Sequence, residues 1–313
     1  METLTMNKKL FDLMTIIEKM GPEESEYPII NKLVDSIKNE EDEQIFGNLV
    51  KPMLNQSTLL GHGFVKPFGY AGDYLLIEKI YQKYISEDVR YYKWDEYYHS
   101  LEAASAVRNR KTYFVKTMQQ LCFRKSGALQ VLILGSGPAT DVHEFLCKKP
   151  DADVTFDLLD IDQRAIDYAS DKNKKFLSKI NFIRMNVLRF APDKKYDLIW
   201  SAGLFDYLND RIFTGLLNRY INNLKKDGEM IIGNFSPLNP TRKVMEIICQ
   251  WYLIHRSSQQ LKQLAVKAGI PRQIIEVDKE PLGINLFLRI KPDKLKVSLQ
   301  NVSSLQHSEK SDL

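Results

Sequence analysis

The sequence is poor in cysteine and in long apolar runs, and each absence excludes a class of protein. Its three cysteines, Cys122, Cys147 and Cys249, are too scattered for a disulfide framework or a Cys-x-x-Cys zinc site, so we expect no metal site. No apolar run approaches the ~20 residues of a membrane span. Charges also interrupt the N-terminal stretch in which a signal peptide would need an apolar core. We therefore expect a cytoplasmic protein with no stable membrane insertion.

Net charge is also low. The formal value of +4 in 313 residues lacks the strong, clustered basic excess of a nucleic-acid-binding surface. Hydrophobic residues make up 44% and charged residues 27%, which is ordinary for a globular chain. We expect a small-molecule partner and no nucleic acid, and the oligomeric state stays open.

What is present divides the chain into two parts. Residues 1–125 carry apolar residues at i, i+3, i+4 and i+7 from Leu10 onward, which predicts a helical N-terminal domain. Within this domain, the Gly- and Pro-containing "GHGFVKPFGYAGDY" (61–74) predicts an ordered loop. The helix that follows is expected to be capped by Asp73.

From residue 126 the pattern changes to short apolar runs separated by helical segments. The strand-like runs are "ALQVLILGSG" (128–137), "VTFDLLDID" (154–162), "INFIRMNV" (180–187), "YDLIWSAG" (196–203) and "GEMIIGNF" (228–235). This alternation predicts a Rossmann-like α/β fold with a mostly parallel sheet. The final "QIIEVDKEPLGINLFLRIKP" (273–292) predicts a terminal antiparallel hairpin. The core domain is thus expected over 126–293, with a disordered polar tail over 294–313.

The loop after the first strand-like run suits a negatively charged ligand group. Gly135 and Gly137 allow a sharp turn and a close approach of the ligand, and the helix expected to begin near Thr140 presents its N-terminus to the same place. A dinucleotide turn needs a third glycine for close helix–strand packing, but Thr140 occupies that position. The loop therefore favours a smaller, carboxylate-bearing cofactor, with a nucleotide-dependent oxidoreductase as the alternative.

In their order and spacing, residues 131–291 resemble the class I S-adenosylmethionine-dependent methyltransferases. The resemblance rests on "VLILGSGPATD", on the acids of "LLDID", on the polar loop "RMNV", and on "YDLIWSAGLFDYL" and "LKKDGEMIIGNF". It departs from the family at Ile133, where an acidic residue often stands. The resemblance implies S-adenosyl-L-methionine as the cofactor.

The same resemblance implies a role for each segment. Asp160 is expected to bind the ribose diol, because both oxygens of a carboxylate accept hydrogen bonds. Asn186 stands where the family usually has an Asp that faces the adenine, with an ordinary turn residue as the alternative reading. The implied cofactor-binding residues are Gly135, Ser136 and Gly137 at the methionine and ribose, Asp160 and Ile161 at the ribose, Asn186 and Val187 at the adenine, and Ser201, Ala202 and Gly203 near the sulfonium.

Three further stretches resemble a smaller bacterial family associated with 3-hydroxy fatty acid methyl ester biosynthesis. They are "KPFGYAGDYLLIEKIY" (66–81), "AVRNRKTYF" (106–114) and "NFSPLNPTRKVMEIICQWYLIHRS" (234–257). The third contains an expected amphipathic helix that either walls an acyl pocket or covers the sheet.

Two residues of the N-terminal part are expected to act in the site. The glycines around Tyr70 suit a loop that folds over the cofactor as a lid. Arg108 and Arg110 fall on different faces of an expected helix, and we assign Arg110 to a carboxylate of the cofactor, because guanidinium binds carboxylate in bidentate fashion. The alternative for the segment around Tyr70 is an ordinary interhelix loop, and the alternative for Arg110 is a structural ion pair.

The sequence therefore predicts methyl transfer to a small molecule, with the carboxylate of a 3-hydroxy fatty acid as the favoured acceptor. Asp206, Tyr207 and Asn234, after the fourth and fifth strand-like runs, are expected to orient the acceptor. N- or O-methylation of another metabolite is the first alternative. A non-catalytic cofactor-binding module is the alternative from a different class.

Overall fold

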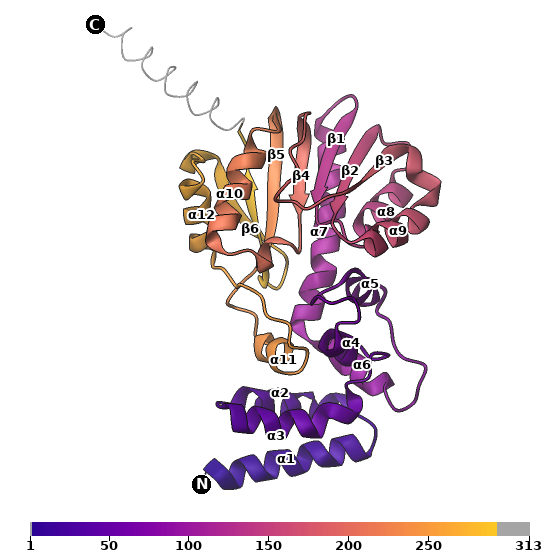
Figure 1. The fold of residues 1–313 in the computed structure, drawn as a ribbon, viewed down its shortest axis with the longest axis vertical. Coiled ribbons are helices and arrows are strands. Elements are labelled where there is room, and N and C mark those ends of the chain that lie inside the picture. The colour runs from indigo at the N-terminus through magenta and orange to yellow at the C-terminus, as the bar shows by residue number, and fades with distance from the viewer. Residues whose placement is uncertain (1, 293–313) are drawn as a thin grey trace, which may run out of the picture. The chain divides into compact units, whose positions relative to one another are not determined.

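The computed structural model describes residues 2–292, with side chains from residue 10 onward. The tail predicted at 294–313 lies outside the described residues. Figure 1 shows the helices and strands in chain order.

By its internal contacts the chain divides into two units. One comprises Met1–Thr112 and Leu238–Leu253, and the other Tyr113–Pro237 and Ile254–Leu313. The boundary between Thr112 and Tyr113 falls inside helix α7 (Glu102–Arg124).

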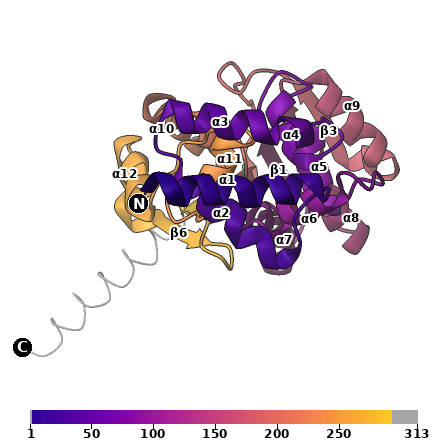
Figure 2. The same ribbon diagram turned by 90° about the horizontal axis from the view of Figure 1, so that it is seen from below.

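Every described element of the first unit is a helix, as the apolar spacing predicted. Besides the first half of α7, they are α1 (Glu2–Glu18), η1 (Glu24–Glu26), α2 (Tyr27–Ser36), α3 (Glu40–Val50), η2 (Lys51–Met53), α4 (Leu59–Val65), α5 (Tyr74–Gln82), α6 (Tyr92–Ser100) and α11 (Arg242–Ile247). Helix α1 lies alongside α2 and α3 (Figures 1 and 2). The apolar stripe of α2 (Ile30, Leu33 and Val34) is buried, as expected for an amphipathic helix that packs through one face.

The segment 61–74 is not a loop throughout. Its first half belongs to α4, and the remainder turns at Gly69 and Gly72, whose φ angles are +89° and +65°. Asp73 caps α5 as predicted, by accepting hydrogen bonds from two backbone N–H groups of the first turn at 3.0 Å. His62 Nε2 binds the same carboxylate at 2.9 Å, so this part of the segment is fixed by buried polar contacts.

We expect Gly61→Ala to destabilise the first unit by about 2 kcal/mol or more, because an added methyl group overpacks a filled site. A Cβ on Gly61 would lie 1.9 Å from the backbone oxygen of Asn55. Gly47 provides the matched control, since it also lies in a helix but its Cβ would meet nothing within 4 Å. Gly47→Ala is expected to stabilise by about 0.5–1 kcal/mol through helix propensity. Chemical denaturation of both variants checks the prediction, and equal effects would contradict it.

The amphipathic helix expected within 234–257 forms only in part, as α11. Side chain–backbone hydrogen bonds join α11 and the residue before it to other helices of the first unit. Thr241 Oγ1 accepts from the backbone N–H of Ala103 at 3.1 Å, and Lys243 Nζ donates to the carbonyl of Asp35 at 2.8 Å. This helix therefore packs in the first unit and does not cover the sheet, while its role in an acyl pocket stays a prediction.

The second unit is built on a seven-stranded sheet of order β3-β2-β1-β4-β5-β7-β6 (Figure 1). The strands are β1 (Leu129–Leu134), β2 (Val154–Asp160), β3 (Ile180–Arg184), β4 (Tyr196–Ser201), β5 (Leu224–Phe235), β6 (Ile275–Lys279) and β7 (Asn285–Ile290). The first five are parallel, while β7 is antiparallel to both β5 and β6. The predicted Rossmann-like sheet with a terminal antiparallel hairpin is thus confirmed.

Helices cover both faces of this sheet. They are the second half of α7, α8 (Thr140–Lys148), α9 (Gln163–Lys172), η3 (Lys174–Lys179), η4 (Phe205–Tyr207), α10 (Asp210–Ile221), α12 (Ser258–Lys267) and η5 (Arg272–Ile274). Successive side chains of a strand point to opposite faces. On β1, Leu132 and Leu134 pack in the core under α10 and α12, whereas Val131 and Ile133 pack under α7 and α8. Two apolar cores therefore hold β1 and β4 at the centre of the sheet.

Candidate functional site

The order of the parallel strands reverses between β1 and β4, which are neighbours in the sheet. Ligands of open α/β sheets bind outside the carboxyl ends of the strands at such a reversal. We call the carboxyl ends of β1–β5 the carboxyl edge. The predicted glycine loop leaves β1 at this edge, and the predicted Ser201, Ala202 and Gly203 end or follow β4 there.

The glycine loop has a backbone that requires glycine. Gly135 and Gly137 have φ angles of +69° and +54°, a left-handed conformation that costs other residues free energy. A Cβ on Gly135 would lie 3.2 Å from the Cβ of Leu204, whereas a Cβ on Gly137 would meet nothing within 4 Å. Gly135 is therefore packed against the protein, while Gly137 leaves its open side free for a ligand.

Asp160, the last residue of β2, is tied to this loop. Its Oδ2 accepts a hydrogen bond from the backbone N–H of Gly137 at 2.8 Å, and its Oδ1 accepts one from the N–H of Asp162 at 3.0 Å. The backbone N–H of Ile161 also binds this carboxylate, which keeps a lone pair for a ligand hydroxyl. Burial raises the pKa of Asp160, and the backbone hydrogen bonds oppose that rise. The arrangement presents two fixed acceptors beside the glycine loop.

Apolar surface borders Asp160. The Ile161 side chain is 62% exposed and that of Met185 is 42% exposed, although both are large and apolar. The backbone N–H of Met185 donates to the carbonyl of Asp160 at 3.0 Å, so the ends of β2 and β3 are joined at this point. Exposed apolar groups beside a fixed carboxylate suit a ligand that carries both hydroxyls and a flat ring.

Asn186 and Val187 follow β3, and both engage the protein. Asn186 Oδ1 accepts from the backbone N–H of Leu188 at 2.8 Å, which closes a local turn. The Val187 carbonyl accepts from the hydroxyl of Tyr220 at 2.9 Å. The assigned contacts of these two residues to an adenine stay a prediction.

A test of fit for a cofactor comes from Ser136 and Ser201. Ser201 is fully buried, and its Oγ donates to the carbonyl of Leu134 at 2.8 Å, which joins β4 to β1. Ser136 is also buried, but its Oγ makes no hydrogen bond among the described residues. A buried hydroxyl without a partner is unfavourable. Its position between two left-handed glycines fits a bound polar group that supplies the missing partner.

A residue that the sequence reasoning missed, Arg256, joins Asn234 to the segment that contains Asp206. Arg256 is 2% exposed and donates to Asn234 Oδ1 at 2.8 Å, to the Phe205 carbonyl at 3.2 Å and to the Leu208 carbonyl at 2.5 Å. Asp206 Oδ1 in turn accepts from the backbone N–H of Phe235 at 2.6 Å. This polar cluster joins the segments that follow β4 and β5.

The signal for Arg256 was present in the sequence as a single cation that follows the apolar stretch "WYLIH". A single charge of this kind is usually exposed, so the pattern alone gave it no role. Tyr207, the third predicted orienting residue, lies in η4 and is 40% exposed. The structure thus gives Asp206 and Asn234 protein partners and leaves the Tyr207 ring accessible.

Tyr70 and Arg110 belong to the first unit. Tyr70 is 39% exposed on the turn between Gly69 and Gly72, and Arg110 is buried, with its Nε 3.5 Å from the hydroxyl of Tyr81. Their expected contacts with the cofactor stay predictions.

Comparison with known proteins identifies the segment that carries the carboxyl edge. Residues 131–228 match the family described as methyltransferase domain. Over 107 residues the chain is 30% identical to a malonyl-[acyl-carrier protein] O-methyltransferase of Acetivibrio thermocellus. The aligned segment covers 34% of this chain and 36% of that protein. A second such enzyme, from Ilyobacter polytropus, is 30% identical over 105 residues, which is 34% of this chain and 39% of that protein. The match thus spans little more than a third of these relatives.

A solved structure shares the fold over more of the chain. It is described as a possible exported protein from Bordetella parapertussis, and the likeness covers 90% of this chain and 96% of that one, with a TM-score of 0.62 and 16% identity. At this identity the likeness concerns the fold alone.

Proposed function

We infer that this chain, whose residues 131–228 match a methyltransferase domain, is a class I methyltransferase that transfers a methyl group from S-adenosylmethionine to a small-molecule acceptor. S-adenosylmethionine is the methyl donor of that class, and when bound it supplies an activated methyl group on a sulfonium. The observation that carries the proposal is the pairing of the left-handed Gly135–Gly137 loop with the Asp160 carboxylate.

Different residues of the second unit are proposed to bind different parts of the cofactor. Asp160 accepts hydrogen bonds from the ribose hydroxyls in addition to those from its backbone N–H partners. Ile161 supplies exposed apolar surface beside it, and Ser136 Oγ gains the hydrogen-bond partner that it lacks within the protein. Asn186, Val187, Ala202 and Gly203 remain the proposed neighbours of the adenine and the sulfonium.

A carboxylate is the acceptor we favour. A carboxylic acid with a pKa of about 4 is ionised at neutral pH and needs no general base, so the protein has only to bring it into line with the methyl group. Two relatives that this chain matches over little more than a third of their length are named as O-methyltransferases, which supports an oxygen acceptor. The resemblance to the hydroxy fatty acid methyl ester family favours a 3-hydroxy fatty acid. An amine or hydroxyl of another metabolite is the alternative.

Asp206 and Asn234 are proposed to act as positioning residues. Both are fully or almost fully buried and bind the protein chain, so they orient the segments after β4 and β5. Tyr207, which follows Asp206 in the sequence and is exposed, is the proposed contact with the acceptor.

Acceptor identity is tested by incubating the full chain with methyl-labelled S-adenosylmethionine and 3-hydroxy fatty acids of increasing chain length. The corresponding amides serve as controls, because they lack the carboxylate. We expect labelled methyl esters that mild alkali cleaves, and no labelled amide. Label in an alkali-stable product from a cell extract would favour the amine or hydroxyl alternative. Cofactor binding without transfer to any component of the extract would indicate a non-catalytic module.

Tyr70 is the proposed lid residue, since its ring is 39% exposed on a turn between two left-handed glycines. We expect Tyr70→Ala to lower kcat while the free energy of unfolding changes by less than about 0.5 kcal/mol, as is usual for exposed positions. Tyr92, 36% exposed on α6, gives the matched control, and Tyr92→Ala should leave kcat unchanged. If both substitutions changed turnover equally, or if neither changed it, Tyr70 would not be part of the site.

We propose that the enzyme works in the cytoplasm. Cys122, Cys147 and Cys249 are free thiols, the state that a reducing compartment maintains. Separately, none of the helices within residues 2–292 combines the length and apolar character needed to cross a membrane.

A further inference from the structure

A basic groove lies in the second unit, away from the residues described above. It runs between the C-terminal half of α7 and the end of β7, and its volume is about 520 Å³. The lining residues are Lys116, Gln119, Gln120, Phe123, Arg124, Arg289 and Lys291. The five from α7 repeat at three- and four-residue intervals, so they share one face of the helix. A volume of 300–1,000 Å³ is the usual range of a small-ligand site.

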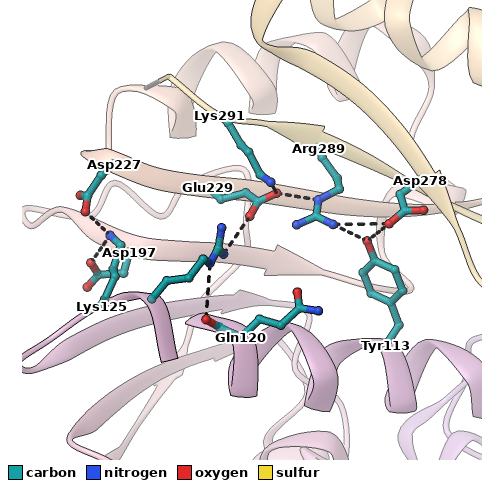
Figure 3. Close-up of polar contacts among 10 residues, drawn as sticks. Tyr113, Gln120, Lys125, Asp197, Asp227, Glu229, Asp278, Arg289 and Lys291 are labelled. Carbon is teal, nitrogen blue, oxygen red and sulfur yellow. Dashed lines mark hydrogen bonds and ion pairs between the residues drawn. The ribbon is translucent and has the colours of Figure 1, made fainter. Parts of the chain in front are cut away.

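Positive charge in this groove exceeds its negative charge. Glu229 of β5, 4% exposed, is contacted by Arg289 at 2.6 Å, by Lys291 at 3.4 Å and by Arg124 at 3.9 Å (Figure 3). One carboxylate thus faces three cations, of which Arg289 also approaches Asp278 at 3.4 Å.

Lys116 adds a fourth cation and forms no ion pair among the described residues. Glu276 of β6 lies directly opposite Arg289 in the strand register and adds a third acid to Glu229 and Asp278. Four cations against these three acids leave a surplus of one positive charge. At pH 7 a phosphate monoester carries about −1.5 to −2 charges, so the positive surplus attracts it.

An apolar group is exposed within the same groove. The Phe123 side chain is 91% exposed, although burial of a phenyl ring is favourable by about 1.5–3 kcal/mol. A ligand that fits both features has a phosphate for the cations and a flat or apolar part for the ring.

The groove does not serve the carboxyl edge directly. Glu229 lies six residues before Phe235 on β5, whose N–H binds Asp206 at that edge. At about 3.3 Å per residue, the two positions are roughly 20 Å apart along the strand. A ligand in the groove would therefore leave the cofactor residues uncovered.

We propose that the groove between α7 and β7 is a second binding site, which takes an organic phosphate of nucleotide size. The cations bind the phosphate oxygens, for which arginine offers paired donors, and Phe123 packs against the organic part. This site is independent of the proposed methyl transfer.

The test is a calorimetric titration of the full chain with uridine monophosphate, with inorganic phosphate and uridine as probes of the two parts. Saturating S-adenosylhomocysteine is present throughout, so that the carboxyl edge is occupied. We expect uridine monophosphate to bind, and phosphate or uridine alone to bind at least about tenfold more weakly, since each retains only part of the contacts. Affinity should fall as salt is raised, because exposed charges are screened.

Two variants and two controls complete the design. Lys116→Glu and Phe123→Ala should each weaken uridine monophosphate binding, the first by about tenfold or more because a charged contact is lost. Lys262→Glu on α12 makes the same change of net charge outside the groove and should have no effect. Asp160→Asn should also leave this affinity unchanged, which separates the groove from the cofactor residues.

Absence of binding would overturn the proposal. Equal affinity for inorganic phosphate and uridine monophosphate would also overturn it, because Phe123 would then have no role. An equal loss of affinity in Lys116→Glu and Lys262→Glu would do the same, because it would indicate only a response to net charge. Lys116 is exposed and makes no ion pair with the part of the chain that the structure describes, so its replacement should leave the thermal midpoint unchanged.

Discussion

Replacement of Arg256 by methionine is expected to destabilise the second unit by at least about 3 kcal/mol, because three acceptors lose a buried donor at about 1 kcal/mol or more each. These acceptors are Asn234 Oδ1 and the carbonyl oxygens of Phe205 and Leu208. The ring of Phe213 also loses the guanidinium that lies 4.7 Å from its centroid. Chemical denaturation measures the loss of unfolding free energy.

Asp210 distinguishes this explanation from a simple ion pair. It binds Arg256 at 2.9 Å but is 67% exposed. Water can replace its partner, so Asp210→Ala should cost less than about 1 kcal/mol, as exposed ion pairs do. If the two variants lose equal stability, the buried acceptors are not the reason for the importance of Arg256.

Asp160→Ala is expected to weaken S-adenosylhomocysteine binding by about 5- to 150-fold, which corresponds to about 1–3 kcal/mol for ribose hydroxyls left without an acceptor. The structure adds a second contribution, because the substitution also frees the backbone N–H of Gly137. Asp160→Asn keeps one side-chain oxygen and should lose less affinity. Titration calorimetry of the three proteins gives this order.

Asp162→Ala is the matched control. Asp162 is also an acid at the end of β2, but its carboxylate caps α9 by accepting from the N–H of Arg164 at 3.0 Å. Its loss should lower stability by about 1 kcal/mol, as for other caps, and change affinity little. If Asp162→Ala weakened binding as much as Asp160→Ala did, the assignment of Asp160 to the ribose would be wrong.

Features encoded by neighbouring residues were predictable from the sequence. The apolar run of β1 and the positive-φ glycines after it depend on a few consecutive residues, and so does the cap of α5 by Asp73. The terminal hairpin was also predictable, because β6 and β7 are joined by a short link that contains Gly283.

Features that depend on distant residues were not predictable. The partners of Arg256 at Asn234 and Phe205 lie 22 and 51 residues away in sequence, and no local pattern marks such contacts. Gly61 was predicted to lie in an ordered loop, but it lies in a helix whose close approach to the Asn55 backbone leaves no room for a Cβ. Likewise, the apolar character of α11 did not reveal which of two units it packs in.

The central claim is that the Gly135–Gly137 loop and Asp160 form a site for S-adenosylmethionine. The most direct test is a calorimetric titration of the full chain with S-adenosylhomocysteine and, separately, with NAD. We expect saturable binding of S-adenosylhomocysteine that weakens in Asp160→Ala, and no binding of NAD. Tight binding of NAD with no response to S-adenosylhomocysteine would contradict it and favour a nucleotide-dependent oxidoreductase.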